Sequence, residues 1–273
     1  MRLLLLILKI LKLNKNLPQD QINTLLKFFS DKRLIEAEKY GVQLSEEYPE
    51  EPFIWKALGI IFKENGKISE SISANKKSLK FNPNDAEVHN NLGFVYQEEK
   101  NYDEAKQWYE EAIRLEPNYI AAHHNLGLIY HLNEEYDKAE ISYKKTIKIK
   151  PDYFPVYNNL GNALIKQGKI IEAEDCYKQA IKFDKKNSEA YNNLGVVLQK
   201  LDKIKEAITA YEQAITYKKD YAEAHYNLGF CLRKLGKFDE ALAEYKKSLI
   251  IKPDYASVES SMLDLLKHMC DFS

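Results

Sequence analysis

The sequence predicts an all-α fold built from tandem repeats, and three observations lead to this prediction. The dipeptide Leu-Gly recurs every 34 residues, with its glycines at Gly59, Gly93, Gly127, Gly161, Gly195 and Gly229. Residues of fixed types return at other places with the same spacing. The composition, with 45% hydrophobic and 30% charged residues but only ten Gly and eight Pro, is typical of a strongly helical protein and not of a disordered one.

Charge and cysteine usage exclude several classes of protein. The chain has 40 basic and 41 acidic side chains, and a net charge of −1 excludes a nucleic-acid binder that works by bulk charge. The three cysteines, Cys176, Cys231 and Cys270, are too few and too scattered for a disulfide framework or a CxxC metal site. We therefore expect a reducing, cytoplasmic setting.

Residues 1–17 form an apolar and basic N-terminal segment. Its longest uninterrupted apolar run, Leu3 to Leu8, is far shorter than the roughly 20 residues that span a bilayer. Lys9 and Lys12 interrupt the following apolar residues, and no small-residue cleavage site of a signal peptide follows. Three interpretations stay open: a helix docked on the first repeat, an amphipathic helix (residues 1–15) that contacts a membrane surface or a partner, and a poorly ordered leader.

The 34-residue pattern divides residues 52–255 into six repeats: 52–85, 86–119, 120–153, 154–187, 188–221 and 222–255. We number each repeat so that its glycine is position 8. In the last five repeats, position 20 is alanine (Ala105, Ala139, Ala173, Ala207, Ala241). In the same five repeats, position 24 is tyrosine (Tyr109, Tyr143, Tyr177, Tyr211, Tyr245). Position 32 is proline in four of the six repeats (Pro83, Pro117, Pro151, Pro253). This pattern resembles the tetratricopeptide repeat. The resemblance implies one antiparallel helix pair per repeat and a right-handed α-α superhelix whose concave groove is lined by the first helices.

Two further elements flank the six repeats. Residues 18–51 are expected to form a degenerate seventh repeat, since Ala37 and Pro49 hold the expected places while Leu25 replaces the glycine and Gly41 the aromatic residue. Residues 256–273 are expected to form a capping helix and a junction, because apolar residues recur there at helical spacing (Val258, Met262, Leu265, Leu266, Met269).

The glycine at position 8 lies within a predicted helix, where it costs about 1 kcal/mol relative to alanine. Such a glycine predicts a close approach between helices, and we expect the small alanine at position 20 to be its neighbour. The turns between helices are expected at Asn65-Gly66, Gly168 and Gly236.

The expected groove carries a row of asparagines at position 6, which we call the asparagine row: Asn91, Asn125, Asn159, Asn193 and Asn227. Further asparagines extend this polar stripe (Asn90, Asn158, Asn162, Asn192). An amide donates and accepts at the same time, so the row could hold the backbone of an extended peptide. Equally, the amides could serve folding or solubility. Basic residues towards the C-terminal end favour acidic partners (Lys166, Lys200, Arg233, Lys234).

The sequence contains no catalytic motif, and we expect no catalytic residue, metal site or cofactor. A Walker loop, GxGxxG, HExxH and GxSxG are all absent. His89, His123 and His225 stand at position 4, which Trp55 and Tyr157 fill in other repeats, so they are interpreted as packing residues.

The last residues, Cys270-Asp271-Phe272, resemble the junction after the repeats of protein O-linked N-acetylglucosamine transferases, with Phe272 in place of tryptophan. The resemblance implies that the chain recruits the substrates of such an enzyme and lacks its catalytic domain. Two functions are therefore considered: a non-enzymatic scaffold that binds extended peptides or proteins, and a structural protein that self-assembles through its repeat edges and N-terminal segment.

Overall fold

The structure is a computed structural model, and it describes residues 17–271. The predictions for residues 1–16 lie outside the described residues, as do those that depend on Phe272 and on the side chains of Cys270 and Asp271. The chain divides into two compact blocks, Met1–Ile129 and Tyr130–Ser273, and each is described by itself.

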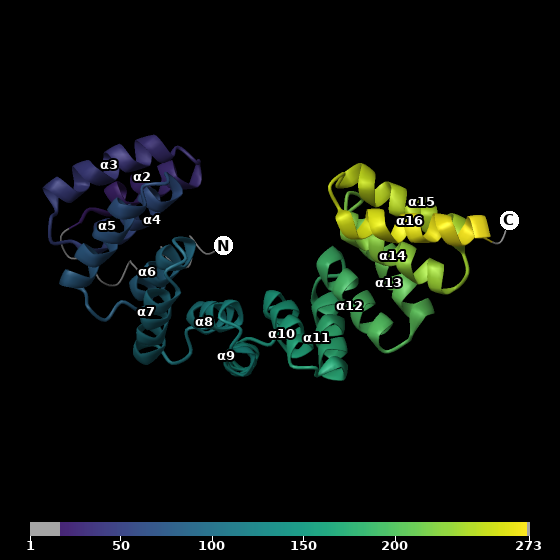
Figure 1. The fold of residues 1–273 in the computed structure, drawn as a ribbon. Helices are drawn as coiled ribbons and strands as arrows, with labels where there is room; N and C mark the ends of the chain where they lie inside the picture. The colour runs from purple at the N-terminus through teal and green to yellow at the C-terminus, as the bar shows by residue number, and fades with distance from the viewer. Residues whose placement is uncertain (1–16, 272–273) are drawn as a thin grey trace. The chain divides into compact units, whose positions relative to one another are not determined.

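The described residues form fifteen α-helices and no strand, which confirms the all-α repeat fold (Figure 1). The N-terminal block holds α2 (Gln19–Ser30), α3 (Leu34–Glu47), α4 (Pro52–Glu64), α5 (Ile68–Phe81), α6 (Ala86–Glu98), α7 (Tyr102–Leu115) and most of α8 (Ile120–Leu132). The C-terminal block holds α9 (Tyr136–Ile149), α10 (Pro155–Lys166), α11 (Ile170–Phe183), α12 (Ser188–Lys200), α13 (Ile204–Tyr217), α14 (Ala222–Lys234), α15 (Phe238–Ile251) and α16 (Ala256–Asp271).

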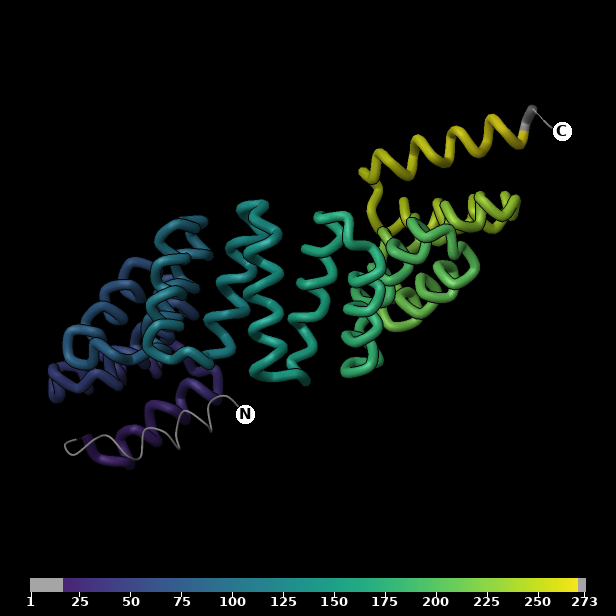
Figure 2. The backbone as a smooth tube through the Cα atoms, turned by 90° about the horizontal axis from the view of Figure 1, so that it is seen from below, coloured from purple at the N-terminus to yellow at the C-terminus, as the bar shows by residue number. Residues whose placement is uncertain are grey.

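Within each block the helices pack in sequence order as antiparallel pairs (Figure 2). The first helix of a pair also contacts the first helix of the next pair, as α4 contacts α6 and α12 contacts α14. Position 3 of the first helix is fully buried from α4 onward, and position 10 is nearly so (Ile54, Val88, Ala122, Val156, Ala190, Ala224, Val258; Ile61, Val95, Ile129, Ala163, Val197, Cys231, Leu265). These two positions therefore form the apolar seam of the stack.

The closest neighbour of the repeated glycine is the side chain at position 24, which is tyrosine opposite Gly93, Gly161, Gly195 and Gly229 and asparagine (Asn75) opposite Gly59. The alanine at position 20, which was expected there, lies farther away: at Gly229 the carbonyl oxygen of Ala241 would be 3.1 Å from the Cβ atom, after two atoms of Tyr245 at 2.8 Å. A Cβ atom on Gly195 would lie 2.5 Å from Cε1 of Tyr211, and one on Gly93 would lie 2.6 Å from the same atom of Tyr109. The tyrosine rings are fully buried. The glycine is required because the ring occupies the space of its missing side chain.

In residues 18–51 the large and small residues change places: position 8 carries a leucine and position 24 carries a glycine. Its first helix carries Leu25, which is 1% exposed, and its second helix carries Gly41. A Cβ atom on Gly41 would lie 3.5 Å from Cδ1 of Leu25 and 2.9 Å from Cδ2 of Leu58. Leu25 therefore lies in van der Waals contact with the glycine of its partner helix, while the tightest approach to Gly41 comes from Leu58 of the next repeat.

The turns between paired helices all place position 15 in the left-handed backbone region. Three of these residues are glycines, as expected for Gly66, Gly168 and Gly236, with φ of 73°, 77° and 74°. The other four are Lys32, Lys100, Glu134 and Asp202, with φ between 57° and 61°. These four residues carry the steric cost of a side chain at positive φ.

Replacing Lys100 with glycine is expected to raise the unfolding free energy by about 0.5–1 kcal/mol, because glycine adopts φ near 61° without a Cβ clash. Urea unfolding followed by circular dichroism measures the change. The reverse substitution, Gly236→Ala, should lower stability by a similar amount. Equal midpoints for wild type and Lys100→Gly would contradict this account of the turn.

The last helix, α16, continues the register of the first helices. The hydroxyl groups of Tyr226 and Ser261, 35 residues apart, lie 3.4 Å from each other, and Val258 and Leu265 occupy the buried positions 3 and 10. At position 8, however, α16 carries Leu263, whose side chain is 55% exposed. The expected helix after Pro253 is thus present and packs on α15 and α14, and its capping role stays a prediction.

Candidate functional site

In five repeats the aromatic residue at position 4 bonds a backbone carbonyl six residues earlier, at position 32 of the preceding repeat. The bonds run from Trp55 to Pro49, His89 to Pro83, His123 to Pro117, Tyr157 to Pro151 and His225 to Lys219, at 2.7 to 3.2 Å. Each ring therefore satisfies a carbonyl left over where one repeat joins the next. The three histidines are buried, which confirms their interpretation as packing residues.

Neighbouring second helices are joined by ion pairs with the spacing of one repeat. Glu140 accepts from Lys144 at 2.6 Å and from Lys169, in the next repeat, at 2.7 Å. Glu174 pairs in the same way with Lys178 and Lys203, and Glu38 with Lys67. Desolvation acts to raise the pKa of Glu140, but the hydrogen bonds from its two lysines outweigh it and lower that pKa to about 2. These glutamates and lysines thus pair with one another within the fold.

The asparagines divide into two groups by exposure. Those at position 5, Asn90, Asn158 and Asn192, are 9%, 6% and 1% exposed, so their side chains lie between neighbouring helices. Members of the asparagine row are half-buried (Asn91, Asn125, Asn159, Asn193, Asn227). Asn162, which is also half-buried, and the row are therefore the asparagines that a partner could contact, except that the amide nitrogen of Asn91 is itself buried.

In the C-terminal block, four asparagines and one tyrosine form a continuous hydrogen-bonded chain. Asn227 donates to Asn192 at 3.2 Å, Asn192 to Asn193 at 3.4 Å, and Asn193 to Asn162 at 3.3 Å. Asn162 also accepts from the hydroxyl of Tyr177 at 2.6 Å. The chain joins the first helices α10, α12 and α14, and it fixes the orientation of each amide in it.

The N-terminal block repeats one link of this arrangement. Asn125 of α8 donates to Asn90 of α6 at 3.1 Å, with the same separation of 35 residues as the link between Asn227 and Asn192. The sequence placed these amides at adjacent positions. It did not reveal that an amide in one repeat donates to the repeat before it.

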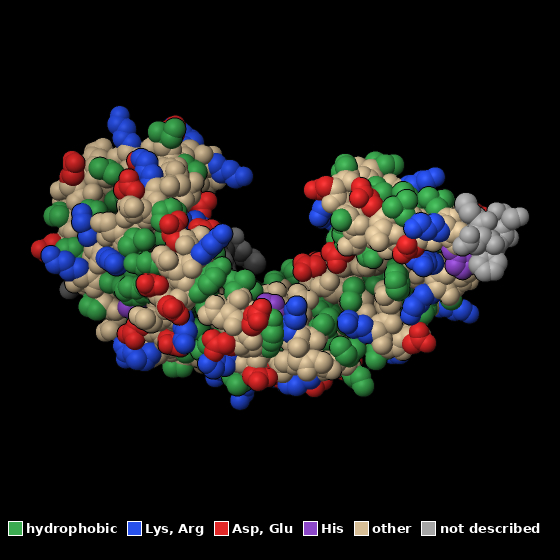
Figure 3. All heavy atoms as spheres, in the orientation of Figure 1, with side chains coloured by type: hydrophobic (Ala, Val, Ile, Leu, Met, Phe, Trp, Pro, Cys, Tyr) green, Lys and Arg blue, Asp and Glu red, His purple; other side chains and the backbone are tan. Residues whose placement is uncertain are grey.

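The basic residues predicted at the C-terminal end lie at the ends of first helices of the C-terminal block. Lys166, Lys200 and Lys234 are exposed, and Arg233 is half-buried. Lys234 lies 3.9 Å from a carboxylate oxygen of Asp202. Across the face seen in Figure 3, acidic and basic side chains are interspersed.

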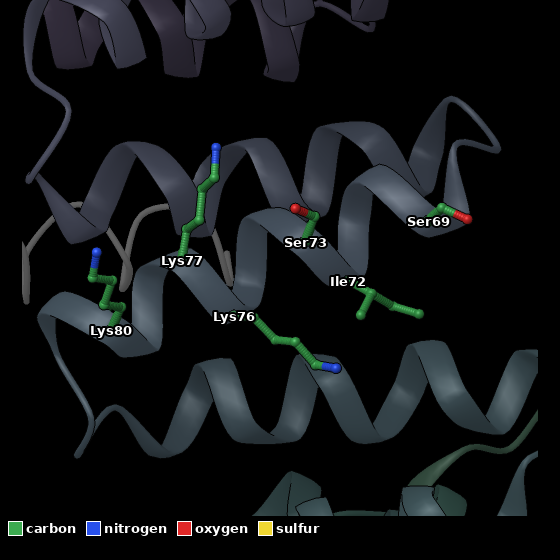
Figure 4. A pocket seen from close by; sticks show the side chains of 6 residues that line it. All are labelled: Ser69, Ile72, Ser73, Lys76, Lys77 and Lys80. Carbon is green, nitrogen blue, oxygen red and sulfur yellow. The ribbon is translucent and has the colours of Figure 1, made fainter.

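A shallow hollow on α5 is lined by Ser69, Ile72, Ser73, Lys76, Lys77 and Lys80. Figure 4 shows that its three lysines point in different directions. Lys77 lies over the ring of Trp55, with Nζ 4.1 Å from the ring centre. The lysines do not converge on one point, so the hollow lacks the geometry of an anion site.

The part of the chain that the structure describes shows no group of three or more His, Cys, Asp or Glu side chains that could hold a metal ion. Burial raises the pKa of the Cys176 thiol to about 12 and that of Cys231 to about 11, so both remain protonated at neutral pH. A protonated thiol is a poor nucleophile. Among the described helices, none is long and apolar enough to cross a bilayer.

Models of the tetratricopeptide repeat match residues 59–100, 84–152, 142–175, 161–202, 200–234 and 222–255, which together run without a gap from residue 59 to 255. No curated protein matches the chain in sequence.

Solved structures similar to the chain include three helical repeat proteins. YrrB, a TPR protein with an unusual peptide-binding site, is 21% identical with a TM-score of 0.60, over 70% of this chain and 98% of that one. MamA is 26% identical with a TM-score of 0.57, over 61% and 97%. The APC/C hetero-tetramer Cut9–Hcn1 is 19% identical with a TM-score of 0.71, over 95% and 51%. With its repeated glycine and aromatic packing, and with family models matching most of its length, the chain belongs to the tetratricopeptide repeat family.

Proposed function

We propose that the protein is a non-enzymatic scaffold that binds extended peptides along the first helices of its repeats. The observation that carries the proposal is the hydrogen-bonded chain from Asn227 to Asn162 in the C-terminal block. These hydrogen bonds hold several amides in fixed orientations on the consecutive first helices α10, α12 and α14. Preorganised polar groups bind a ligand with a smaller loss of conformational entropy.

Asn193 and Asn227 of the asparagine row keep hydrogen-bonding capacity for a ligand. A side-chain amide has two N–H donors and an oxygen that accepts two bonds. Asn227 uses one N–H to bond Asn192, and Asn193 uses one N–H to bond Asn162. The second N–H and the remaining acceptor sites of each amide suit the carbonyl and N–H groups of a peptide backbone. Such contacts favour broad sequence tolerance, because every peptide has the same backbone.

The exposed lysines at the helix ends of the same block give the proposed ligand a preferred charge. Lys166 and Lys200 lie 34 residues apart, at position 13 of consecutive repeats, and both are exposed. Their positive charge favours peptides with acidic residues, by an amount that salt reduces.

The finer proposal is that this scaffold recruits substrates for an O-linked N-acetylglucosamine transferase-like enzyme in the cytoplasm. It is supported by the resemblance of Cys270-Asp271-Phe272 to the junction after the repeats of those enzymes.

The test measures the binding of fluorescein-labelled 12-residue peptides, half of them rich in Asp and Glu, by fluorescence polarisation. The tightest peptide is then measured against the double variant Asn193→Ala and Asn227→Ala. Losing hydrogen bonds worth a net ~0.5–1.5 kcal/mol each should weaken binding about tenfold.

The matched control is Asn133→Ala, which removes the same amide from an exposed turn residue and should leave binding unchanged. Thermal unfolding of each variant separates lost binding from lost folding. Peptide binding of equal strength in wild type and double variant would reject the proposed site.

Self-assembly is the second candidate function, and it is favoured by Leu263 and Leu266 on α16, which are 55% and 37% exposed. Sedimentation velocity over a hundredfold range of concentration distinguishes the two functions. A mass that rises with concentration supports assembly, while a constant monomer mass supports the scaffold.

A further inference from the structure

The first-helix face at the N-terminal end is apolar, unlike the asparagine-bearing first helices that follow it. A cleft between α2 and α4 is lined by Leu26 and Phe29 of α2 and by Phe53, Ala57 and Ile60 of α4, and we call it the apolar cleft. Ala57 stands at position 6, where the next five repeats carry asparagine. Phe29, Ala57 and Ile60 are only half-buried.

The one charged residue that lines this cleft is neutralised within the fold. Lys56 is 8% exposed, and its ammonium group donates to carboxylate oxygens of Asp85 and Glu87 at 3.0 Å each. Desolvation opposes its charged form, but the two carboxylates outweigh it and raise the pKa of Lys56. The cleft therefore presents an apolar surface to whatever covers it.

The described chain begins beside this surface. Leu17 is 5% exposed and belongs to the same apolar cluster as Leu25, Leu26 and Phe53. Between Leu13 and Leu17 lie only three residues, so an extended chain allows at most about 14 Å between their Cα atoms. The apolar N-terminal segment is thus tethered within reach of the cleft.

The other surface within reach does not suit an apolar segment. On α2, positions 3 and 10 are Asp20 and Lys27, where later first helices carry the apolar seam, and both are exposed. Asn23 and Thr24 on the same helix are exposed as well. A polar edge of this kind would gain nothing from apolar cover.

We propose that residues 3–13 of the chain dock as an amphipathic helix in the apolar cleft. Nine of these eleven residues are Leu or Ile, and the two others are Lys9 and Lys12. A helix can place both lysines towards solvent while its leucines cover Phe29, Ala57 and Ile60. The short tether gives the segment a high effective concentration at the cleft, which favours it over a separate partner.

Limited proteolysis of the full chain with trypsin tests the proposal, because docking protects the bonds after Lys9 and Lys12. Mass spectrometry measures the rate of cleavage at these two bonds. In Ile60→Asp a carboxylate enters the cleft, and cleavage is expected at least tenfold faster than in wild type. The matched control, Ile35→Asp, places the same charge on an exposed residue of α3 (79% exposed) and should not change the rate.

A second variant leaves the folded repeats untouched, in case Ile60→Asp disturbs them. Leu4→Asp combined with Leu8→Asp should release the segment and speed cleavage after Lys12. Circular dichroism should lose no more helicity than the eleven released residues account for, because the repeats stay folded. Equal rates in wild type and both variants would overturn the proposal. Protection that appears only with phosphatidylserine vesicles, or that rises with protein concentration, would also overturn it, in favour of a membrane surface or a second copy.

Discussion

Replacing Gly195 with leucine is expected to lower the unfolding free energy by about 3 kcal/mol. Its Cβ atom would lie 2.5 Å from Cε1 of Tyr211, whose ring is fully buried, so either the ring or α12 must move. This cost exceeds the gain of about 1 kcal/mol from removing a glycine from a helix. Urea unfolding measures the difference. Val196→Leu, on the next and half-buried residue, is the control and should change stability by less than about 1 kcal/mol.

The packing of Leu25 against Gly41 suggests a second substitution that should restore part of the stability lost in Gly195→Leu. Tyr211→Gly alone is expected to cost about 4 kcal/mol through the cavity that it leaves. The double variant Gly195→Leu and Tyr211→Gly reproduces the exchanged sizes of the degenerate repeat, and it should cost at least 1 kcal/mol less than the sum of the single changes. Strictly additive costs would show that the two residues do not share one space.

Replacing Glu244 with leucine is expected to lower the unfolding free energy by about 2–3 kcal/mol at pH 7. His225 is 5% exposed, and its Nδ1 lies 2.6 Å from a carboxylate oxygen of Glu244 while its Nε2 faces the carbonyl of Lys219. Removing the carboxylate leaves Nδ1 of this buried ring without its hydrogen-bond partner, and an unsatisfied buried polar group is costly. Thermal unfolding measures the loss, and Glu240→Leu on the exposed side of the same helix is the control.

The pH dependence of this pair has a definite sign. Burial acts to raise the pKa of Glu244, but the hydrogen bonds from His225 and Lys247 outweigh it and the pKa lies below its usual value of 4.5. A lowered carboxyl pKa stabilises the folded state above the unfolded value, and this contribution is lost as the pH falls through the folded value. The stability difference between wild type and Glu244→Leu should therefore shrink below about pH 4.5. A difference that grows on acidification would contradict the assignment.

The sequence predicted the structural features that recur every 34 residues, because each of them requires the same type of residue at the same position of every repeat. The glycine at position 8 was predicted in this way, whereas the turn at Gly66 was predicted from its Asn-Gly pair and the helix after Pro253 from apolar residues at helical spacing. The partner of each glycine was not, since alanine and tyrosine recur equally regularly and only the three-dimensional packing shows which of them fills the space.

The sequence predicted which asparagines belong to the candidate site, but it did not predict the hydrogen bonds between asparagines of neighbouring repeats. The asparagine row is visible as a spacing, whereas the links from Asn227 to Asn192 and from Asn125 to Asn90 join residues 35 apart. These links depend on how far one repeat is rotated against the next, which no local pattern records. The ion pairs of Glu140 and Glu174 with lysines of the next repeat were missed for the same reason.

Leu263 sets a condition for lengthening this protein by design. In four of the repeats, the glycine at position 8 of the first helix leaves space for the tyrosine at position 24 of the second helix, so the two helices can pair. At α16 that place holds a leucine, so a hairpin partner of the usual kind would meet a side chain where it needs an empty space. A designer who grafts another module onto this end would have to replace Leu263 with glycine, or supply a second helix with glycine at position 24, as α3 does with Gly41 opposite Leu25.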